Sequence, residues 1–245
     1  MADTILFDGD TAFEHYQVID TIYEGRPARV LYSGQRGTAQ SGIATDGKSE
    51  LLFDYNQRFI ELLESIPAKR VLLIGGGAYT LPQAILQQFP DMRIDVVEID
   101  PGLKAIAEQF FGLQASTRLQ IFHGDGRAYL ERNPEPYDVI LIDAFSRAEI
   151  PRSLTGHEVA SLVARNLSKD GVIAMNIISP YMGPNNGLIK SQVDSYSECF
   201  KTVAVYPAGR SLFSLWLPQN LILVAQKGKP QEVTLRYGKL ASVEQ

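Results

Sequence analysis

From residue 70 onward, short apolar runs alternate with segments in which apolar residues recur at helical spacing. The apolar runs lie at 71–74, 94–99, 119–122, 138–142, 172–176, 202–206 and 221–225. The helical segments lie at 81–89, 101–111, 127–130, 156–167 and 187–200. A run such as 139–142, apolar at every position, is typical of a strand buried on both faces. This alternation predicts an α/β, Rossmann-like fold with a mainly parallel sheet covered by helices on both faces.

The first 50 residues have a different pattern. Turn signals such as Glu24-Gly25 and Asp46-Gly47 surround β-prone stretches at 16–23 and 28–32, which predicts a small set of β-hairpins. Apolar spacing then predicts a helix over 50–65. We therefore expect three parts, which are a small N-terminal β region (1–50), a Rossmann-like nucleotide-binding catalytic domain (51–230) and a C-terminal tail (231–245).

Glycine and acidic residues gather where the predicted strands end. They are Gly75-Gly76-Gly77 after the first strand of the alternation, Glu98 and Ile99 at the end of the second, Gly124-Asp125-Gly126 after the third and Asp143 after the fourth. In open parallel sheets, ligands bind at the carboxyl ends of the strands. The sequence therefore predicts one ligand site that contains all four segments.

The residues after the glycines bear on which ligand fits. A dinucleotide fingerprint, G-x-G-x-x-G, ends in a glycine at its sixth position. Counted from Gly75, this chain has Thr80 there, and this disfavours an NAD-dependent oxidoreductase. Glu98 is placed to accept both hydroxyls of a ribose. Asp125 is placed to accept from an adenine amino group, to cap the helix that follows, or to do both. A glycine turn without any ligand is the alternative.

Composition narrows the class of partner. The chain has 245 residues, a formal net charge of -5 and one cysteine, Cys199. We expect no nucleic-acid partner, because binding to nucleic acid needs clustered Lys and Arg. We expect no signal peptide, membrane segment or disulfide, and hence a cytoplasmic protein. We expect no metal, since His15, His123 and His157 lack metal-ligand spacing.

Two further segments are candidates for the rim of the site. Residues 179–187 form a Gly/Pro/Asn-rich loop after a strand, where loops shape substrate sites, so Tyr181 and Asn176 are candidate substrate contacts. Trp216 lies in an apolar segment for which packing or an interface is favoured over catalysis.

The motifs at 71–77, 97–101, 124–126 and 137–140 resemble the spermidine synthase (polyamine aminopropyltransferase) family. They are most similar to a divergent bacterial branch with Asp143-Ala144-Phe145, followed by Ile150-Pro151 and Leu154-Thr155. The resemblance implies the class I S-adenosylmethionine-dependent methyltransferase fold with a small N-terminal β-hairpin region.

The resemblance also implies a function and a set of site residues. The family transfers an aminopropyl group from decarboxylated S-adenosylmethionine to a diamine. By resemblance, Glu98 holds the ribose, Asp125 holds the adenine, Gln17 borders the ligand and Tyr55 lies on the substrate side. The family usually dimerises, which implies a homodimer.

Three departures from the family pattern bear on catalysis. Ala78 replaces an aspartate after the third glycine, Ser146 replaces the second aspartate of the catalytic loop, and Tyr55-Asn56-Gln57 lacks a carboxylate of the diamine side. Asp143 and Ser146 are then the catalytic candidates. Two interpretations follow: a transferase that moves a methyl or aminopropyl group to a small amine, or a catalytically inactive nucleotide-binding homologue with a regulatory or scaffold role.

The departure at Ala78 also predicts the donor. An aspartate at this position would bind the ammonium of decarboxylated S-adenosylmethionine and would repel the carboxylate of intact S-adenosylmethionine. Ala78 does neither. Backbone N–H groups of the glycine loop and of the helix start near Tyr79 are expected to face that carboxylate. The sequence thus favours intact S-adenosylmethionine over its decarboxylated form, with no metal in either case.

Overall fold

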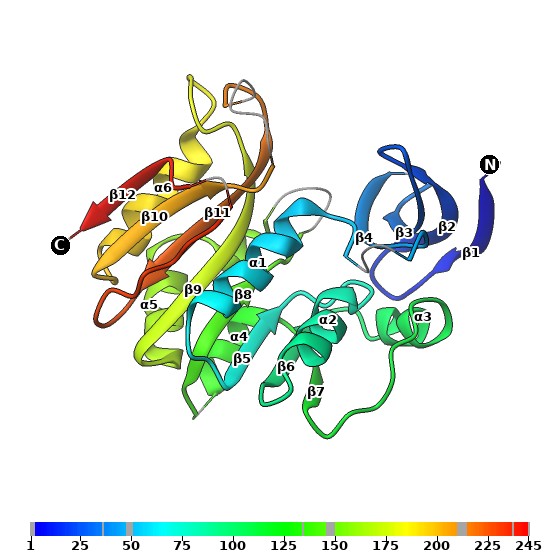
Figure 1. Cartoon of the computed structure of the whole chain (residues 1–245), viewed down its shortest axis with the longest axis horizontal. Coiled ribbons are helices and arrows are strands. Elements are labelled where there is room, and N and C mark those ends of the chain that lie inside the picture. The colour runs from blue at the N-terminus through cyan, green and yellow to red at the C-terminus, as the bar shows by residue number, and fades with distance from the viewer. Residues whose placement is uncertain are drawn as a thin grey trace.

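The computed structural model describes residues 3–35, 37–47, 51–133, 135–145, 150–209, 215–236 and 238–244, and for 241–244 only the backbone. Two sheets lie side by side (Figure 1). The smaller is antiparallel, in the order β1 (Thr4–Asp10), β2 (His15–Tyr23), β3 (Arg26–Ser33) and β4 (Thr38–Ala44). The sequence predicted β2 and β3 of this sheet but neither of its edge strands.

The larger sheet has eight strands in the order β12-β10-β11-β9-β8-β5-β6-β7. Its strands are β5 (Arg70–Ile74), β6 (Arg93–Glu98), β7 (Leu119–His123), β8 (Tyr137–Ile142), β9 (Leu167–Ser179), β10 (Thr202–Pro207), β11 (Gln219–Gln226) and β12 (Ala241–Glu244). From β7 to β9 the strands are parallel, and from β9 to β12 they are antiparallel. The expected C-terminal tail thus contributes β12 to the sheet edge.

Helices cover both faces of this sheet, as the sequence predicted. One face carries α1 (Asp54–Ser65), α2 (Thr80–Gln88) and α3 (Gly102–Phe110). The other carries α4 (Gly126–Arg132), α5 (His157–Asn166) and α6 (Gly187–Ser197), and a short 3-10 helix spans Arg152–Leu154. Alternate residues of β5 pack into opposite layers, with Leu73 in the first and Leu72 in the second. The fold is therefore the predicted Rossmann-like α/β fold.

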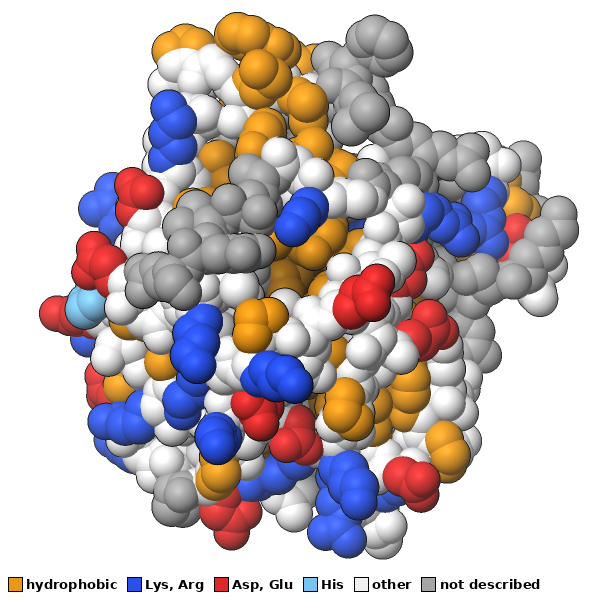
Figure 2. All heavy atoms as spheres, turned by 60° about the vertical axis from the view of Figure 1, so that its left-hand side comes forward, with side chains coloured by type: hydrophobic (Ala, Val, Ile, Leu, Met, Phe, Trp, Pro, Cys, Tyr) orange, Lys and Arg blue, Asp and Glu red, His pale blue; other side chains and the backbone are white. Residues whose placement is uncertain are grey.

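One apolar patch remains at the surface where the loop after β9 meets residues 215–217. The backbone N–H groups of Tyr181 and Met182 both donate to the Leu215 carbonyl, which joins the two segments. Trp216 and Leu217 are 62% and 63% exposed there. Figure 2 shows apolar side chains gathered at the top of the molecule, where these two segments lie in Figure 1. Trp216 belongs to this outer patch and is not among the described residues that line the strand-end cavity presented below.

In the described part of the chain, none of the helices combines the length and apolar character that a membrane crossing requires.

Candidate active site

The glycine turn after β5 is required by close packing inside the protein. Gly75 has φ +98°, and a Cβ there would lie 2.2 Å from the Asp143 carbonyl oxygen at the end of β8. Gly77 has φ +50°, and its Cβ would lie 2.4 Å from the Ser41 hydroxyl of β4. Side chains are excluded at both positions by sterics and by backbone conformation. The turn therefore holds two strand ends and the smaller sheet in close contact.

The N–H groups of this turn are already used within the protein. Each of the five from residue 75 to residue 79 donates to a protein acceptor. The acceptors are the carbonyl of Val97 for Gly75, the carboxylate of Glu98 for Gly76 and Gly77, the hydroxyl of Ser41 for Ala78, and the carbonyl of Gly76 for Tyr79. A methionine carboxylate near Tyr79 would therefore have to share or replace these internal hydrogen bonds, and its binding there stays a prediction.

Glu98 ends β6 and lies beneath the glycine turn, only 7% exposed. One carboxylate oxygen accepts the N–H groups of Gly76 and Gly77 at 2.7 and 3.2 Å, and the other accepts that of Asp100 at 2.9 Å. Burial raises the pKa of Glu98, and these three hydrogen bonds oppose the rise. Since each carboxylate oxygen accepts about two hydrogen bonds, the oxygen that accepts only the Asp100 N–H retains one acceptor position.

Asp125 follows β7 and caps α4, because its carboxylate accepts the N–H of Ala128 at 2.9 Å. The capping interpretation of this residue is thus confirmed. Asp125 and Gly126 also line the same cavity as Glu98, together with Ile99, which is 48% exposed. Gly126 leaves no room for a side chain, since its Cβ would lie 2.4 Å from Ile74.

Asp143 follows β8 and is partly buried. The Asn176 amide of β9 donates to it at 3.1 Å, and the Tyr55 hydroxyl of α1 donates as well. Burial raises the pKa of Asp143 to about 6 despite these two donors. The carbonyl oxygen of the Asn176 side chain is buried and has no hydrogen-bond partner among the residues that the structure describes. The reacting end predicted from sequence thus contains a carboxyl poised to titrate and an unused acceptor beside it.

These residues surround one cavity of about 340 Å³. Its described lining includes five carboxylates and no Lys, Arg or His. The carboxylates are those of Glu14, Glu98, Asp100, Asp125 and Asp143. Such a lining, partly removed from water, strongly favours a cationic ligand.

Two other predicted site residues, Gln17 and Tyr181, are not among the described residues that line this cavity. The Gln17 amide donates to Asp8 at 2.7 Å, whereas its neighbour Tyr16 lines the cavity. Tyr181 belongs to the outer apolar patch, and its N–H and carbonyl are engaged by the two loops. Ser146 lies outside the described residues. Within the described ranges, no three His, Cys, Asp or Glu residues are placed to bind a metal ion.

The sequence did not indicate the cavity residues that come from the smaller sheet. Ser41, Tyr16, Phe13 and Glu14 all line it. The motif signal ended at the strand-helix alternation, and these residues reach the site only through tertiary packing. In the sequence, only the acidic Glu14 next to the β-prone stretch at 16–23 could have indicated that this region contributes to the cavity.

The larger sheet and its helices have the class I methyltransferase fold. Human Methyltransferase-like protein 13 in complex with SAH superposes with a TM-score of 0.58 at 26% identity, over 74% of this chain and 82% of that chain. A probable spermidine synthase from Corynebacterium glutamicum ATCC 13032 superposes with a TM-score of 0.76 at 22% identity, over 91% and 80%.

Residues 60–211 match the model of the spermine/spermidine synthase domain, and the chain belongs to that family. A polyamine aminopropyltransferase from Vibrio vulnificus (strain CMCP6) is 36% identical over 121 residues, which is 48% of this chain and 40% of that protein. The match thus spans about two fifths of the length of this relative. The family resemblance found in the motifs is confirmed.

The raised pKa of Asp143 predicts a specific pH dependence of stability. Between its ordinary value of 3.8 and about 6, the folded carboxyl holds a proton that the unfolded one has lost. The free energy of unfolding of the parent should therefore fall as pH rises through this range, by at most about 3 kcal/mol. Asp143→Asn should lack this fall, as measured by denaturant unfolding from about pH 4 to about pH 8.

Asp91→Asn, at an exposed position, is the matched control and should follow the parent. Parallel curves for the parent and Asp143→Asn would contradict a raised pKa at this site.

Proposed function

We propose that this chain transfers an alkyl group from an adenosyl sulfonium donor to a small amine. The observation that carries the proposal is the order of acidic residues along four adjacent strand ends. Asp143 follows β8, the glycine turn follows β5, Glu98 ends β6 and Asp125 follows β7. A donor lying across these ends has its reacting carbon at Asp143, its ribose at Glu98 and its adenine at Asp125.

Each end of the cavity suits the group assigned to it. The Glu98 oxygen that accepts only the Asp100 N–H can accept a ribose hydroxyl as well. Ile99 and Leu154 supply apolar surface beside Asp125 for the purine. At the other end, the Asp143 carboxylate and the Tyr55 hydroxyl oxygen line the cavity and can accept the N–H groups of an amine.

The charge of the cavity favours a donor without a carboxylate. Decarboxylated S-adenosylmethionine carries a sulfonium and an ammonium, whereas the intact form adds a carboxylate. The described lining offers five carboxylates and no cationic side chain, and the N–H groups of the glycine turn are all taken. These features support the decarboxylated donor over the intact S-adenosylmethionine that Ala78 suggested, and we propose aminopropyl transfer.

The reaction is a displacement in which the amine lone pair forms the new C–N bond. The C–S bond breaks and its electrons neutralise the sulfonium, which leaves 5′-methylthioadenosine. The amine nitrogen then sheds a proton, and Asp143 is the acceptor in reach of it. A carboxylate whose pKa is raised to about 6 is a better base than an ordinary one. Holding both reactants in line supplies the rest of the acceleration.

Binding of the nucleoside is tested first from the ligand side, because Glu98 also supports the fold. The parent should bind 5′-methylthioadenosine about tenfold or more tightly than its 2′-deoxy analogue, the size of a hydrogen bond to a charged group. In Glu98→Gln this preference should shrink, as measured by calorimetry on both proteins. An undiminished preference would mean that Glu98 does not contact the ribose.

Turnover tests the role of Asp143. Asp143→Asn keeps the shape and the contact with Asn176 but removes the base, so aminopropyl transfer to putrescine should fall by about 100-fold or more. Ser146→Ala should cost much less. Equal losses would remove Asp143 from the reacting end, and a parent that binds donor but forms no product would favour the regulatory or scaffold homologue.

A further inference from the structure

The turn between β1 and β2 carries Phe13 and Glu14 to the donor cavity, and the proposed function gives neither a role. Both residues line the cavity. Phe13, a large apolar side chain in the turn between β1 and β2, is 54% exposed. Apolar surface at a cavity mouth is surface that a bound ligand removes from water.

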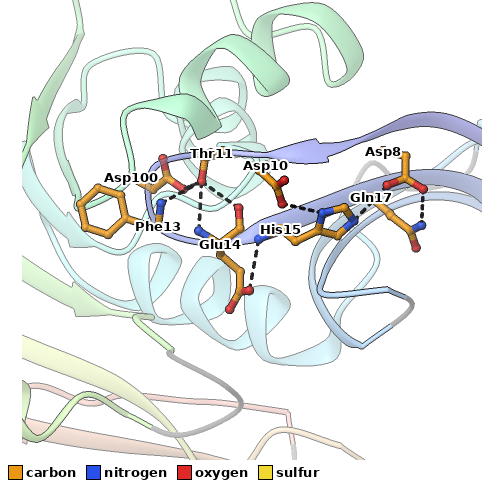
Figure 3. A network of polar contacts seen from close by, with 8 residues as sticks. All are labelled: Asp8, Asp10, Thr11, Phe13, Glu14, His15, Gln17 and Asp100. Atoms are coloured by element: carbon orange, nitrogen blue, oxygen red, sulfur yellow. Dashed lines mark hydrogen bonds and ion pairs between the residues drawn. The ribbon is translucent and has the colours of Figure 1, made fainter.

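Thr11 fixes this turn to the larger sheet. Its hydroxyl lies 2.5 Å from a carboxylate oxygen of Asp100 and donates to it (Figure 3). The same hydroxyl oxygen accepts the N–H groups of Phe13 and Glu14 at 3.2 and 3.1 Å. A hydrogen bond to a carboxylate is about twice as strong as one between neutral groups. The backbone of the turn is therefore held at one point, the Asp100 carboxylate.

Asp100 links the turn to the carboxylate proposed to hold the ribose. Asp100 is 1% exposed, and its N–H donates to Glu98 at 2.9 Å. Its carboxylate also accepts the N–H of Gly102 at 2.9 Å and the hydroxyl of Tyr16. A Cβ on Gly102 would lie 2.6 Å from the Thr11 methyl group, so the turn rests directly on the start of α3.

The stem of the same hairpin is braced by side chains. The two ring nitrogens of His15 lie 2.8 and 2.9 Å from the carboxylates of Asp10 and Asp8. The Asp10 carboxylate holds the pKa of His15 above its usual value. Gln17 donates to Asp8 from the same strand. These side-chain contacts between β1 and β2 hold the two strands together below the turn that reaches the cavity.

We propose that residues 11–14 form a clamp on the nucleoside part of the donor. This inference rests on the proposed function. Phe13 packs its ring on the nucleoside beside Ile99, and Thr11 is a positioning residue that sets Phe13 through Asp100. Because the clamp is joined to Asp100 and Glu98, it acts at the ribose and purine and not at the amine end.

Calorimetry with 5′-methylthioadenosine tests the clamp, because this ligand has the nucleoside but neither the cation nor the acceptor. Phe13→Ala should weaken binding by about tenfold, which corresponds to about 1.4 kcal/mol. Ile22→Ala, which removes a 44% exposed side chain of β2 outside the cavity, should leave binding unchanged. Equal binding by the parent and Phe13→Ala overturns the clamp alone. A parent that does not bind at all overturns the proposed function and the clamp with it.

Thr11 is tested with two substitutions that separate its hydroxyl from its packing. Thr11→Val keeps the shape and loses the bond to Asp100, so the dissociation constant should rise by about five- to tenfold, within the net contribution of one typical hydrogen bond. Thr11→Ser keeps the hydroxyl and should bind within about twofold of the parent. With steady-state turnover, Thr11→Val should raise the donor KM and leave the putrescine KM unchanged. Equal losses of nucleoside binding in both variants would overturn the positioning role.

Discussion

The buried carboxylate of Glu98 is the interaction on which the site depends. One of its oxygens accepts the N–H groups of Gly76 and Gly77, which follow β5, and the other accepts the N–H of Asp100, which follows β6. The free-energy cost of burying this charge is offset by three directed hydrogen bonds. Since the glycine turn, β6 and, through Asp100, the N-terminal hairpin all meet there, the shape of the donor cavity follows from one side chain.

The two carboxylates at the ends of β6 and β8 are held differently, and this separates their roles. Glu98 receives backbone donors, which fix its position and favour its ionised form. Asp143 receives only the side chains of Asn176 and Tyr55, and its pKa is raised to about 6. The first is suited to hold a neutral ribose in one orientation. The second is suited to meet a cation and to take up a proton as the reaction proceeds.

The larger sheet and the strand-end residues could be predicted from sequence, because strict strand-helix alternation brings the carboxyl ends of parallel strands to one edge. Gly75, Glu98, Asp125 and Asp143 line one cavity for that reason. The contact of Thr11 with Asp100 joins positions 89 apart in the chain and leaves no local pattern. Successive residues of a strand point to opposite faces of the sheet. Tyr16 lines the cavity, so its neighbour Gln17, which was expected at the ligand, points the other way. The donor preference inferred from Ala78 stays a prediction, and the bonds of the loop N–H groups to Ser41 and Glu98 argue against it.

We propose that a cavity lined by carboxylates selects a donor without a carboxylate of its own. The most direct measurement is the pair of dissociation constants for decarboxylated and intact S-adenosylmethionine, determined side by side by calorimetry at about pH 7.5 and low salt, where screening is weakest. Tighter binding of the decarboxylated form by about tenfold or more, with a difference that narrows as salt is added, is the result predicted. Equal affinities, or tighter binding of the intact form, would contradict the account.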